Sequence, residues 1–236
     1  MQTKQRIYET AKILFIEEGY QRTTNRKIAE AAGVNQGLIS YYFKHKQNIA
    51  ITILRENYQI LSGHLRNEID VHKDPFLFNI AVDNMMSRLS YFSKDYFRFL
   101  NELFDENLVL ESIYQGVQKN DLMLLLAKYE PEYQSDAEKS FRRFVSLTFP
   151  TAIEIQRNIN RGFAFSFDEY YNLMVHLWTF ALNLKWTESE IQKAIEESSA
   201  AVDRIIASYP FLKNPGKFLY SKELLTPTPI EKLLDI

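Results

Sequence analysis

The stretch from Thr24 to Phe43 limits the possible folds of this chain more than any other segment. Thr24 is a good N-cap, because its hydroxyl can accept a hydrogen bond from a free backbone N–H at the start of a helix. Gly33 follows the last apolar position of that helix, where a left-handed glycine ends a helix at little cost. Asn35 can cap a second helix, whose apolar face comprises Leu38, Ile39, Tyr42 and Phe43. The pattern predicts two short helices joined by a glycine-containing turn.

The distribution of charge sets this end of the chain apart. The net charge of the whole chain is −2, which by itself argues against a polyanionic partner. Residues 1–48, however, carry eight lysine or arginine residues and four acidic ones, whereas the remainder carries 20 basic and 26 acidic residues. A basic end on an acidic body indicates that only the N-terminal part meets a polyanion, although chance unevenness is the simpler alternative.

Several classes of protein are made improbable by the composition. The chain has no cysteine, so a disulfide framework, thiolate metal sites and cysteine nucleophiles are excluded. The first residues do not resemble a signal peptide, and the most apolar long run is too short to span a bilayer. The four histidines lack metal-ligand spacing, and no phosphate loop or GxSxG motif occurs. We therefore expect a cytoplasmic protein that is not an enzyme and has no cofactor or metal.

The rest of the chain predicts helices throughout, so the fold class is all-α. The first helix covers residues 3–18, and a longer one runs from Gln47 to about Leu65. Further helices are predicted at residues 76–92, 95–107, 108–128, 135–161 (kinked or split at Pro150), 168–185 and 188–208. Residues 230–236 are expected to form a turn or two of helix. The expected domains are 1–48, with the two-helix motif at 24–43, and 49–236.

At this point the sequence resembles the DNA-binding domain of TetR-family (tetracycline-repressor-like) transcriptional regulators. The resemblance lies in the first 50 residues and follows a fixed order of short motifs. These are residues 7–11 through Phe15, then 18–20, 23–24, 28–29, 32–34 and 37–43, followed by Lys46. Ser40 departs from the tyrosine of many members. The resemblance implies a three-helix helix-turn-helix domain, followed by a larger helical domain that binds a ligand and dimerises.

The second helix of the motif is expected to enter the major groove of DNA. Gln36 is the best candidate for reading a base, since its amide can pair with adenine, and Gly37 permits close approach of the backbone. Tyr41, Tyr42 and Lys46 are phosphate contacts by resemblance. The other expected DNA-binding residues are Thr24, Arg26, Lys27, Asn35 and Ser40. Alternatives stay open at three of these positions: Tyr42 as a core residue, Asn35 as a cap only, and Lys27 as a solvated side chain.

The larger domain gives weaker signals. Aromatic residues and methionines crowd one region and would suit a small apolar or aromatic effector, although such a cluster is more often ordinary core. The expected ligand-binding residues are Met85, Met86, Tyr91, Phe92, Phe97, Phe104 and Tyr114. The helices near 168–185 and 188–208 are expected to pair with those of a second copy, unless they pack only within one subunit. The expected dimer residues are Leu173, Leu177, Phe180, Ile191, Ile195 and Val202.

The sequence therefore predicts a DNA-binding transcriptional regulator that contains no membrane segment. We expect a ligand-responsive repressor that acts as a homodimer on a palindromic double-stranded DNA operator. The alternative is a helical protein that sequesters a small molecule or lipid and does not bind DNA.

Overall fold

The computed structural model describes residues 3–130 and 135–209, and within these ranges the chain forms α-helices and no β-strand. The predicted turn of helix at residues 230–236 lies outside the described residues. The all-α fold class is thus confirmed. The helices are α1 (Thr3–Glu17), α2 (Asn25–Ala32), α3 (Gly37–Phe43), α4 (Lys46–Leu65), α5 (Pro75–Phe92), α6 (Lys94–Asp105), α7 (Leu108–Gln115), α8 (Val117–Tyr129), α9 (Ala137–Asn160), α10 (Phe167–Ala181) and α11 (Glu188–Ser208).

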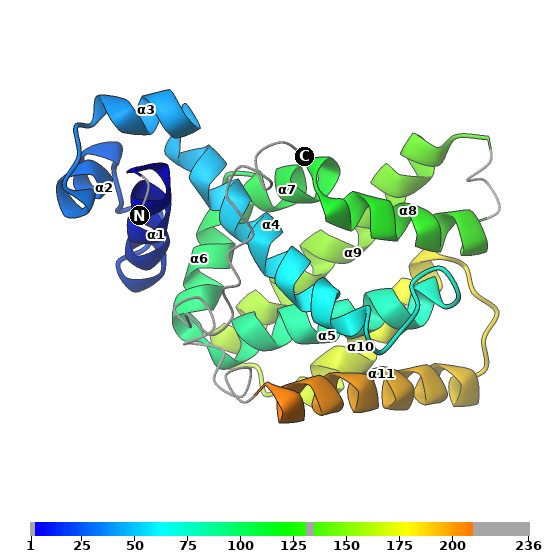
Figure 1. Cartoon of the computed structure of the whole chain (residues 1–236). Helices are drawn as coiled ribbons and strands as arrows, with labels where there is room; N and C mark the ends of the chain where they lie inside the picture. Colours follow the sequence, from blue (N-terminus) through cyan, green and yellow to red (C-terminus); the bar gives the residue numbers. More distant parts are fainter. Residues whose placement is uncertain (1–2, 131–134, 210–236) are drawn as a thin grey trace.

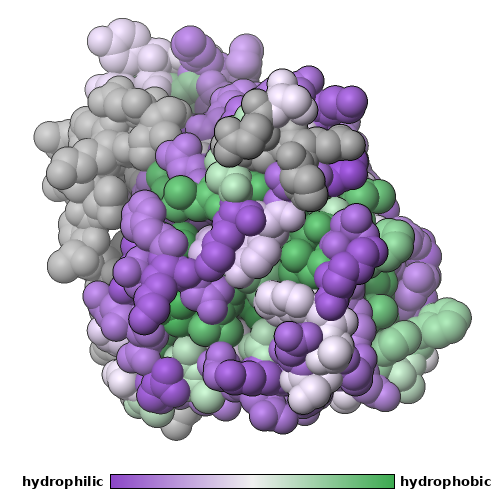
Figure 2. All heavy atoms as spheres, turned by 90° about the vertical axis from the view of Figure 1, so that its right-hand side faces the viewer, coloured by the Kyte–Doolittle hydropathy of each residue, from purple (hydrophilic) through white to green (hydrophobic). Residues whose placement is uncertain are grey.

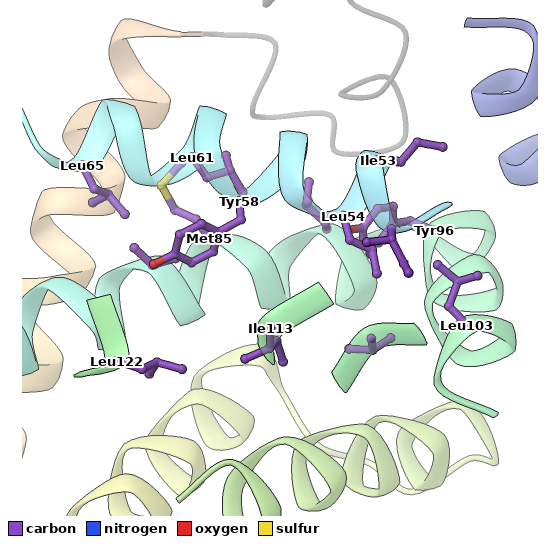
Figure 3. Close-up of a cluster of buried hydrophobic side chains, with 14 of the residues drawn as sticks. Ile53, Leu54, Tyr58, Leu61, Leu65, Met85, Tyr96, Leu103, Ile113 and Leu122 are labelled. Carbon is purple, nitrogen blue, oxygen red and sulfur yellow. The ribbon is translucent and has the colours of Figure 1, made fainter. Parts of the chain in front are cut away.

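Helices α1 to α3 form a small unit at one end of the molecule, and α4 leads from it into the larger bundle (Figure 1). In the bundle, α4 packs against α5, α7 and α8, while α11 packs along α5. One buried face of α4 includes Leu54, Tyr58 and Leu61, and Met85 of α5 lies beside Tyr58 and Leu61 (Figure 3). Helices α4 and α5 therefore form the centre of the apolar core.

The expected helix over residues 108–128 is wrong, because Gly116 divides it into α7 and α8. The backbone of Gly116 is extended, with φ −106° and ψ 177°. A Cβ atom at this position would lie only 2.7 Å from the carbonyl oxygen of Ser112. Only glycine fits this sharp bend between two helices without a backbone shift.

The expected end of the helix at residue 185 is also wrong, since α10 ends at Ala181. Asn183 has a φ of 54°, a left-handed value that asparagine tolerates better than most residues. The N–H of Leu184 donates to the carbonyl of Thr179, and the N–H of Asn183 donates to that of Phe180. This is a Schellman motif, which satisfies the last carbonyl groups of the helix without continuing it.

In α9 the predicted split at Pro150 does not occur. Pro150 lies inside it, but α9 continues as one helix from Ala137 to Asn160. The hydroxyls of Thr148 and Thr151 donate to the carbonyl groups of Phe144 and Leu147, four residues before each. These two threonines lie on either side of the proline in the sequence. Among the described residues, no helix is both long and apolar enough to cross a membrane.

Candidate nucleic-acid interface and interior cavity

The turn between α2 and α3 is built from the capping residues that the sequence indicated. The Thr24 hydroxyl accepts a hydrogen bond from the N–H of Lys27 at 3.2 Å, so Thr24 is the N-cap of α2. Gly33 adopts the left-handed conformation, with φ 61° and ψ 43°. The N–H of Val34 then donates to the carbonyl of Ala29, which closes the helix with a Schellman motif. These bonds fix the angle at which the chain enters α3.

The start of α3 is held by Asn35. Its Oδ1 atom accepts a hydrogen bond from the N–H of Gly37 at 2.8 Å, and its backbone carbonyl accepts one from Leu38. The helix itself begins at Gly37, and Gln36, at the N-cap position, makes no side-chain cap. A Cβ atom at Gly37 would lie 3.2 Å from Asn35 Oδ1 and press on this bond. Gln36 is exposed, and its amide is not used for capping.

The outer face of α3 is polar and accessible. Ser40 is exposed, and 78% of Tyr41 is exposed, whereas Ile39 and Phe43 are buried. Tyr42 is half-buried, and its ring meets that of Tyr41 edge to face, with 4.9 Å between the ring centroids. A short helix with a buried apolar side and a free polar side is the form required of a helix that enters a groove of DNA.

The three expected cations lie close to this face, but each already has partners. Arg26 is exposed and its Nε atom lies 2.7 Å from Glu30 Oε1. Lys27 forms an ion pair with Glu18. The ammonium of Lys46 donates to the carbonyl groups of Tyr20 at 2.9 Å and Thr23 at 3.1 Å, and burial lowers the pKa of Lys46. Lys46 therefore braces the loop before α2, and its expected phosphate contact stays a prediction.

Lys44 is an exposed cation of this face that the sequence reasoning missed. It is the residue after α3, and it has φ 63° and ψ −60°. The N–H of His45 donates to the carbonyl of Phe43 at 2.7 Å, so Lys44 is the central residue of a γ-turn. A turn of this hand is strained for a residue with a Cβ atom, and such strain is concentrated at functional sites. In the sequence, the basic segment Lys44-His45-Lys46 directly after the second helix of the motif indicated this position.

We expect Lys44→Gly to stabilise the folded chain by about 1 kcal/mol, because relief of the backbone strain exceeds the entropic cost of glycine. Lys44→Ala is the matched control, since it removes the same charge but keeps the Cβ atom. Thermal unfolding followed by circular dichroism measures both. A similar rise in melting temperature for the two variants would show that charge, rather than backbone strain, is responsible.

Helix α6 connects the small unit to the bundle (Figure 1). Arg98 donates to the carbonyl groups of Ile16 and Glu17 at the end of α1. Glu102 accepts a hydrogen bond from the N–H of Gln21 at 2.9 Å, and Glu106, just after α6, accepts one from the Tyr20 hydroxyl at 3.0 Å. These contacts join α6 and the residue after it to the end of α1 and to the loop between α1 and α2.

A cavity of about 100 Å³ lies inside the bundle, on the side of α6 opposite to its contacts with the loop between α1 and α2. Side chains from α4 to α10 surround it, and α6 contributes Tyr96 and Leu100. Most of the wall is apolar or aromatic, with a few polar groups from α5, α7, α8 and α9. Apolar walls with a few polar groups are typical of small-molecule sites.

Of the seven residues expected to bind a ligand, Met86 lines this cavity and the other six do not. Met85 points into the core between α4 and α5 (Figure 3). Phe92 is 55% exposed at the end of α5, and Tyr91 lies beside it with its hydroxyl bonded to the carbonyl of Phe165. Phe97 lines an outer groove, the Arg157 guanidinium lies over Phe104, and Tyr114 packs on Phe141. Aromatic density along a sequence does not specify which side chains share one helix face.

Asp83 is the most unusual group in the cavity wall. Burial alone raises the pKa of its carboxyl group from 3.8 to about 7. Two tyrosines nearby, Tyr170 and Tyr171, have pKa values raised well above 10, mainly by burial. Groups with such displaced pKa values in a cavity are candidates for ligand binding. The sequence reasoning missed Asp83, although an acidic residue within the apolar face of a helix is a recognisable signal.

The six expected dimer residues divide into two groups. Leu173 is 41% exposed and Phe180 is 76% exposed, and Leu177 between them is half-buried, so these three form an apolar stripe on α10. Ile195 is also half-buried. Ile191 and Val202 are buried within the chain itself, where α11 packs on α5. Their apolar spacing on α11 therefore belongs to the subunit core, and the exposed members of the six, Leu173 and Phe180, lie on α10.

The geometry of residues 24–43 defines a helix-turn-helix domain, the class of unit that transcriptional regulators use to bind DNA. Residues 7–53 match the family model described as bacterial regulatory proteins, tetR family. The N-terminal domain of this chain is therefore a DNA-binding helix-turn-helix domain of the TetR type.

Relatives support this assignment at the same end of the chain. The probable HTH-type transcriptional regulator YttP of Bacillus subtilis (strain 168) is 42% identical over 57 residues, which is 24% of this chain and 28% of that protein. An HTH-type transcriptional regulator of Staphylococcus aureus (strain USA300) is 26% identical over 86 residues, or 36% of this chain and 46% of that protein. The similarity thus spans less than half the length of either relative.

One solved structure is similar over a longer range. The fatty acid degradation regulator FadR from Bacillus halodurans has 17% sequence identity and a TM-score of 0.47. The comparison covers 79% of this chain and 98% of that one.

Proposed function

We propose that this protein is a ligand-responsive repressor that binds a near-palindromic operator as a homodimer. In this proposal, residues 1–48 bind DNA, and residues 49–236 bind the effector and form the dimer. One observation carries the proposal: α6 contacts the loop before α2 on one side and the interior cavity on the other. A ligand in the cavity is thus mechanically connected to the DNA-binding unit.

The reading of DNA is assigned to the exposed face of α3. Gln36 and Ser40 face solvent near the start of α3, where a recognition helix meets base edges. Tyr41 is positioned to donate its hydroxyl to a phosphate group, and Lys44 adds positive charge. Thr24 and the N-terminus of α2 offer backbone N–H groups to a second phosphate. Arg26 and Lys27 supply further charge when DNA phosphates replace their carboxylate partners.

The response to a ligand is assigned to α6. Tyr96 and Leu100 touch the cavity, whereas Arg98 and Glu102 touch the DNA-binding unit. A ligand that favours one position of α6 then favours one spacing of the two recognition helices in a dimer. DNA affinity changes only by the ratio of ligand affinities for the two conformations.

The experiment that tests DNA reading compares Gln36→Ala with Tyr41→Phe on a library of operator variants. For Gln36→Ala we expect a loss of about 1 to 3 kcal/mol at one base position and a weaker effect elsewhere. For Tyr41→Phe we expect a loss of about 2 kcal/mol at every sequence, because a hydrogen bond to a charged phosphate disappears. Gel-shift titration at fixed salt concentration measures both.

Lys193→Ala provides the control, since Lys193 is exposed on α11, away from the helix-turn-helix unit. Its affinity is expected to match that of the unaltered protein at all sites. If Gln36→Ala loses affinity equally at every base, Gln36 is not a base reader. If no sequence in the library binds more tightly than random DNA, the protein is instead a helical small-molecule carrier.

A further inference from the structure

One face of α5 forms the longest continuous wall of the cavity. The cavity-lining residues of this helix recur at helical spacing: Asn79, Val82, Asp83, Met86, Ser87 and Ser90. Asp83 lies near the middle of this series. Asp83 is half-buried, and cavity-lining residues lie on both sides of it along the helix.

Asp83 differs from Asp121, a buried aspartate of the same bundle. Asp121 accepts two hydrogen bonds from Arg66 at 2.7 Å and one from the Tyr58 hydroxyl at 2.5 Å. Within residues 3–130 and 135–209, no hydrogen bond or ion pair reaches the carboxylate of Asp83. A half-buried carboxylate without a protein partner is stabilised when a ligand supplies the missing cation or donor.

A second acceptor in the cavity also lacks a donor. Gln156 is 4% exposed, and its Nε2 atom donates to the Tyr170 hydroxyl at 3.0 Å. Its Oε1 atom is buried and has no hydrogen-bond partner among the described residues. The cavity wall thus presents an amide oxygen and a carboxylate, both of which need donors.

The remaining walls suit a cation with an apolar body. Aromatic rings of Tyr58, Tyr96, Phe149, Tyr170 and Trp178 line the cavity, and ring faces attract cations. In the described part of the chain, the lining contains no lysine, arginine or histidine. A carboxylate or phosphate ligand would therefore meet Asp83 without any compensating positive charge.

We propose that the cavity binds an organic cation, a protonated amine on a small apolar or aromatic body, whose ammonium group pairs with Asp83. The Oε1 atom of Gln156 accepts a further hydrogen bond from the same group. This inference rests on the proposed ligand response and specifies the chemical class of the effector.

The volume limits the size of this ligand. A cavity of about 100 Å³ is smaller than the roughly 300 to 1,000 Å³ that drug-sized ligands occupy. An ammonium group with one ring is therefore the appropriate first probe, and the flexible side chain of Met86 is able to move to admit the ring. We select 2-phenylethylamine, with 2-phenylethanol as its neutral analogue and phenylacetate as its anionic analogue.

Isothermal titration calorimetry measures the affinity of the full chain for each probe. We expect the amine to bind, the alcohol to bind more weakly, and phenylacetate to show no binding. In Asp83→Asn, amine affinity is expected to fall about tenfold to a hundredfold, the effect of losing a hydrogen-bonded charge. The affinity for the alcohol is expected to change less than twofold. Asp168→Asn, an exposed position on α10, is the control and is expected to retain full amine affinity.

The affinity for the amine should also rise with pH through the range in which Asp83 ionises. The other titratable groups in the cavity wall are Tyr58, Tyr96 and Tyr170, and their raised pKa values keep them neutral in this range. Asp83→Asn should remove the pH dependence between pH 6 and 8. Circular dichroism shows whether Asp83→Asn is folded, and the alcohol provides a second check through retained binding.

The outcomes separate this inference from the proposed function. Amine binding that depends on Asp83 but leaves operator affinity unchanged supports the ligand class and contradicts the ligand response. If the alcohol or phenylacetate releases the operator as well as the amine does, the proposed ligand response is supported. The proposal that the ligand is an organic cation is then overturned. Equal amine affinity in Asp83→Asn, or no amine binding by the unaltered protein, also overturns it.

Discussion

Glu56→Gln is expected to destabilise the protein by about 3 to 5 kcal/mol, because it leaves a buried ammonium without its counter-ion. Glu56 lies on α4 and is 4% exposed, and its Oε2 atom lies 2.7 Å from both Lys12 Nζ and the Tyr8 hydroxyl of α1. Burial and the charge of Glu56 raise the pKa of Tyr8, so this hydroxyl remains a donor at all physiological pH values. The network thus attaches the first helix of the DNA-binding unit to the helix that leads into the bundle.

Equilibrium unfolding in urea measures this loss, and the chain offers a matched control. Arg26 and Glu30 form an ion pair with the same 2.7 Å separation, but both side chains are mostly exposed. Glu30→Gln is therefore expected to change the free energy of unfolding by about 0 to 1 kcal/mol. The two glutamine variants differ mainly in the burial of the charge that remains, so a similar small effect in both would contradict the argument.

A double variant tests whether the cost comes from the unpaired charge. Lys12→Met in the Glu56→Gln background removes the ammonium and fills part of its space with an apolar chain. We expect the double variant to be more stable than Glu56→Gln alone, because replacing both members of a buried pair is far less costly than removing one. If the two losses simply add, the ion pair is not the stabilising interaction.

The sequence was sufficient to predict the helix-turn-helix unit because its structure is determined locally. Thr24 and Gly33 set the ends of α2, and Asn35 organises the start of α3, through bonds that span at most five positions. Such caps are visible in sequence as residue types at fixed spacing. The Lys12–Glu56 pair is not visible in this way, because 44 residues separate its members.

The lining of the cavity differs from the predicted set of ligand-binding residues for a related reason. Met85 and Met86 are adjacent in sequence, but successive residues on a helix point about 100° apart, so one enters the core and the other the cavity. Whether Met85 or Met86 faces the cavity depends on how α6 and α9 pack against α5. That packing cannot be predicted from local sequence patterns. The periodic placement of Asp83 among Val82, Met86 and Ser87 is the local signal that the prediction overlooked.

Phe180→Asp is expected to produce a monomer and to lower operator affinity by about 100-fold or more. The ring of Phe180 is 76% exposed on α10, one turn from Leu177 and two turns from Leu173. Apolar side chains at this spacing form a continuous stripe on one side of a helix, and a large exposed aromatic is typical of an interface. Apolar surface is also visible on the face of the molecule shown in Figure 2. A carboxylate in a two-fold interface would face its own copy and be desolvated there.

The loss of operator affinity follows from effective concentration. In the proposed dimer, binding of one recognition helix places the second next to its half-site, a gain of about 10²- to 10⁴-fold over separate units. A monomer loses this gain although every contact of α3 with its half-site is retained. Sedimentation velocity measures the assembly state, and fluorescence anisotropy measures affinity for a full operator and for a single half-site.

Phe180→Leu is the matched control, because it keeps an apolar side chain at the same position and is expected to remain dimeric. Phe180→Asp should stay folded, since most of the ring makes no contact within the chain, and its affinity for an isolated half-site should equal that of the unaltered protein. This last measurement separates loss of the dimer from damage to the recognition helix. A Phe180→Asp variant that remains dimeric would place the interface elsewhere, and a monomer with full operator affinity would show that one helix-turn-helix unit is sufficient.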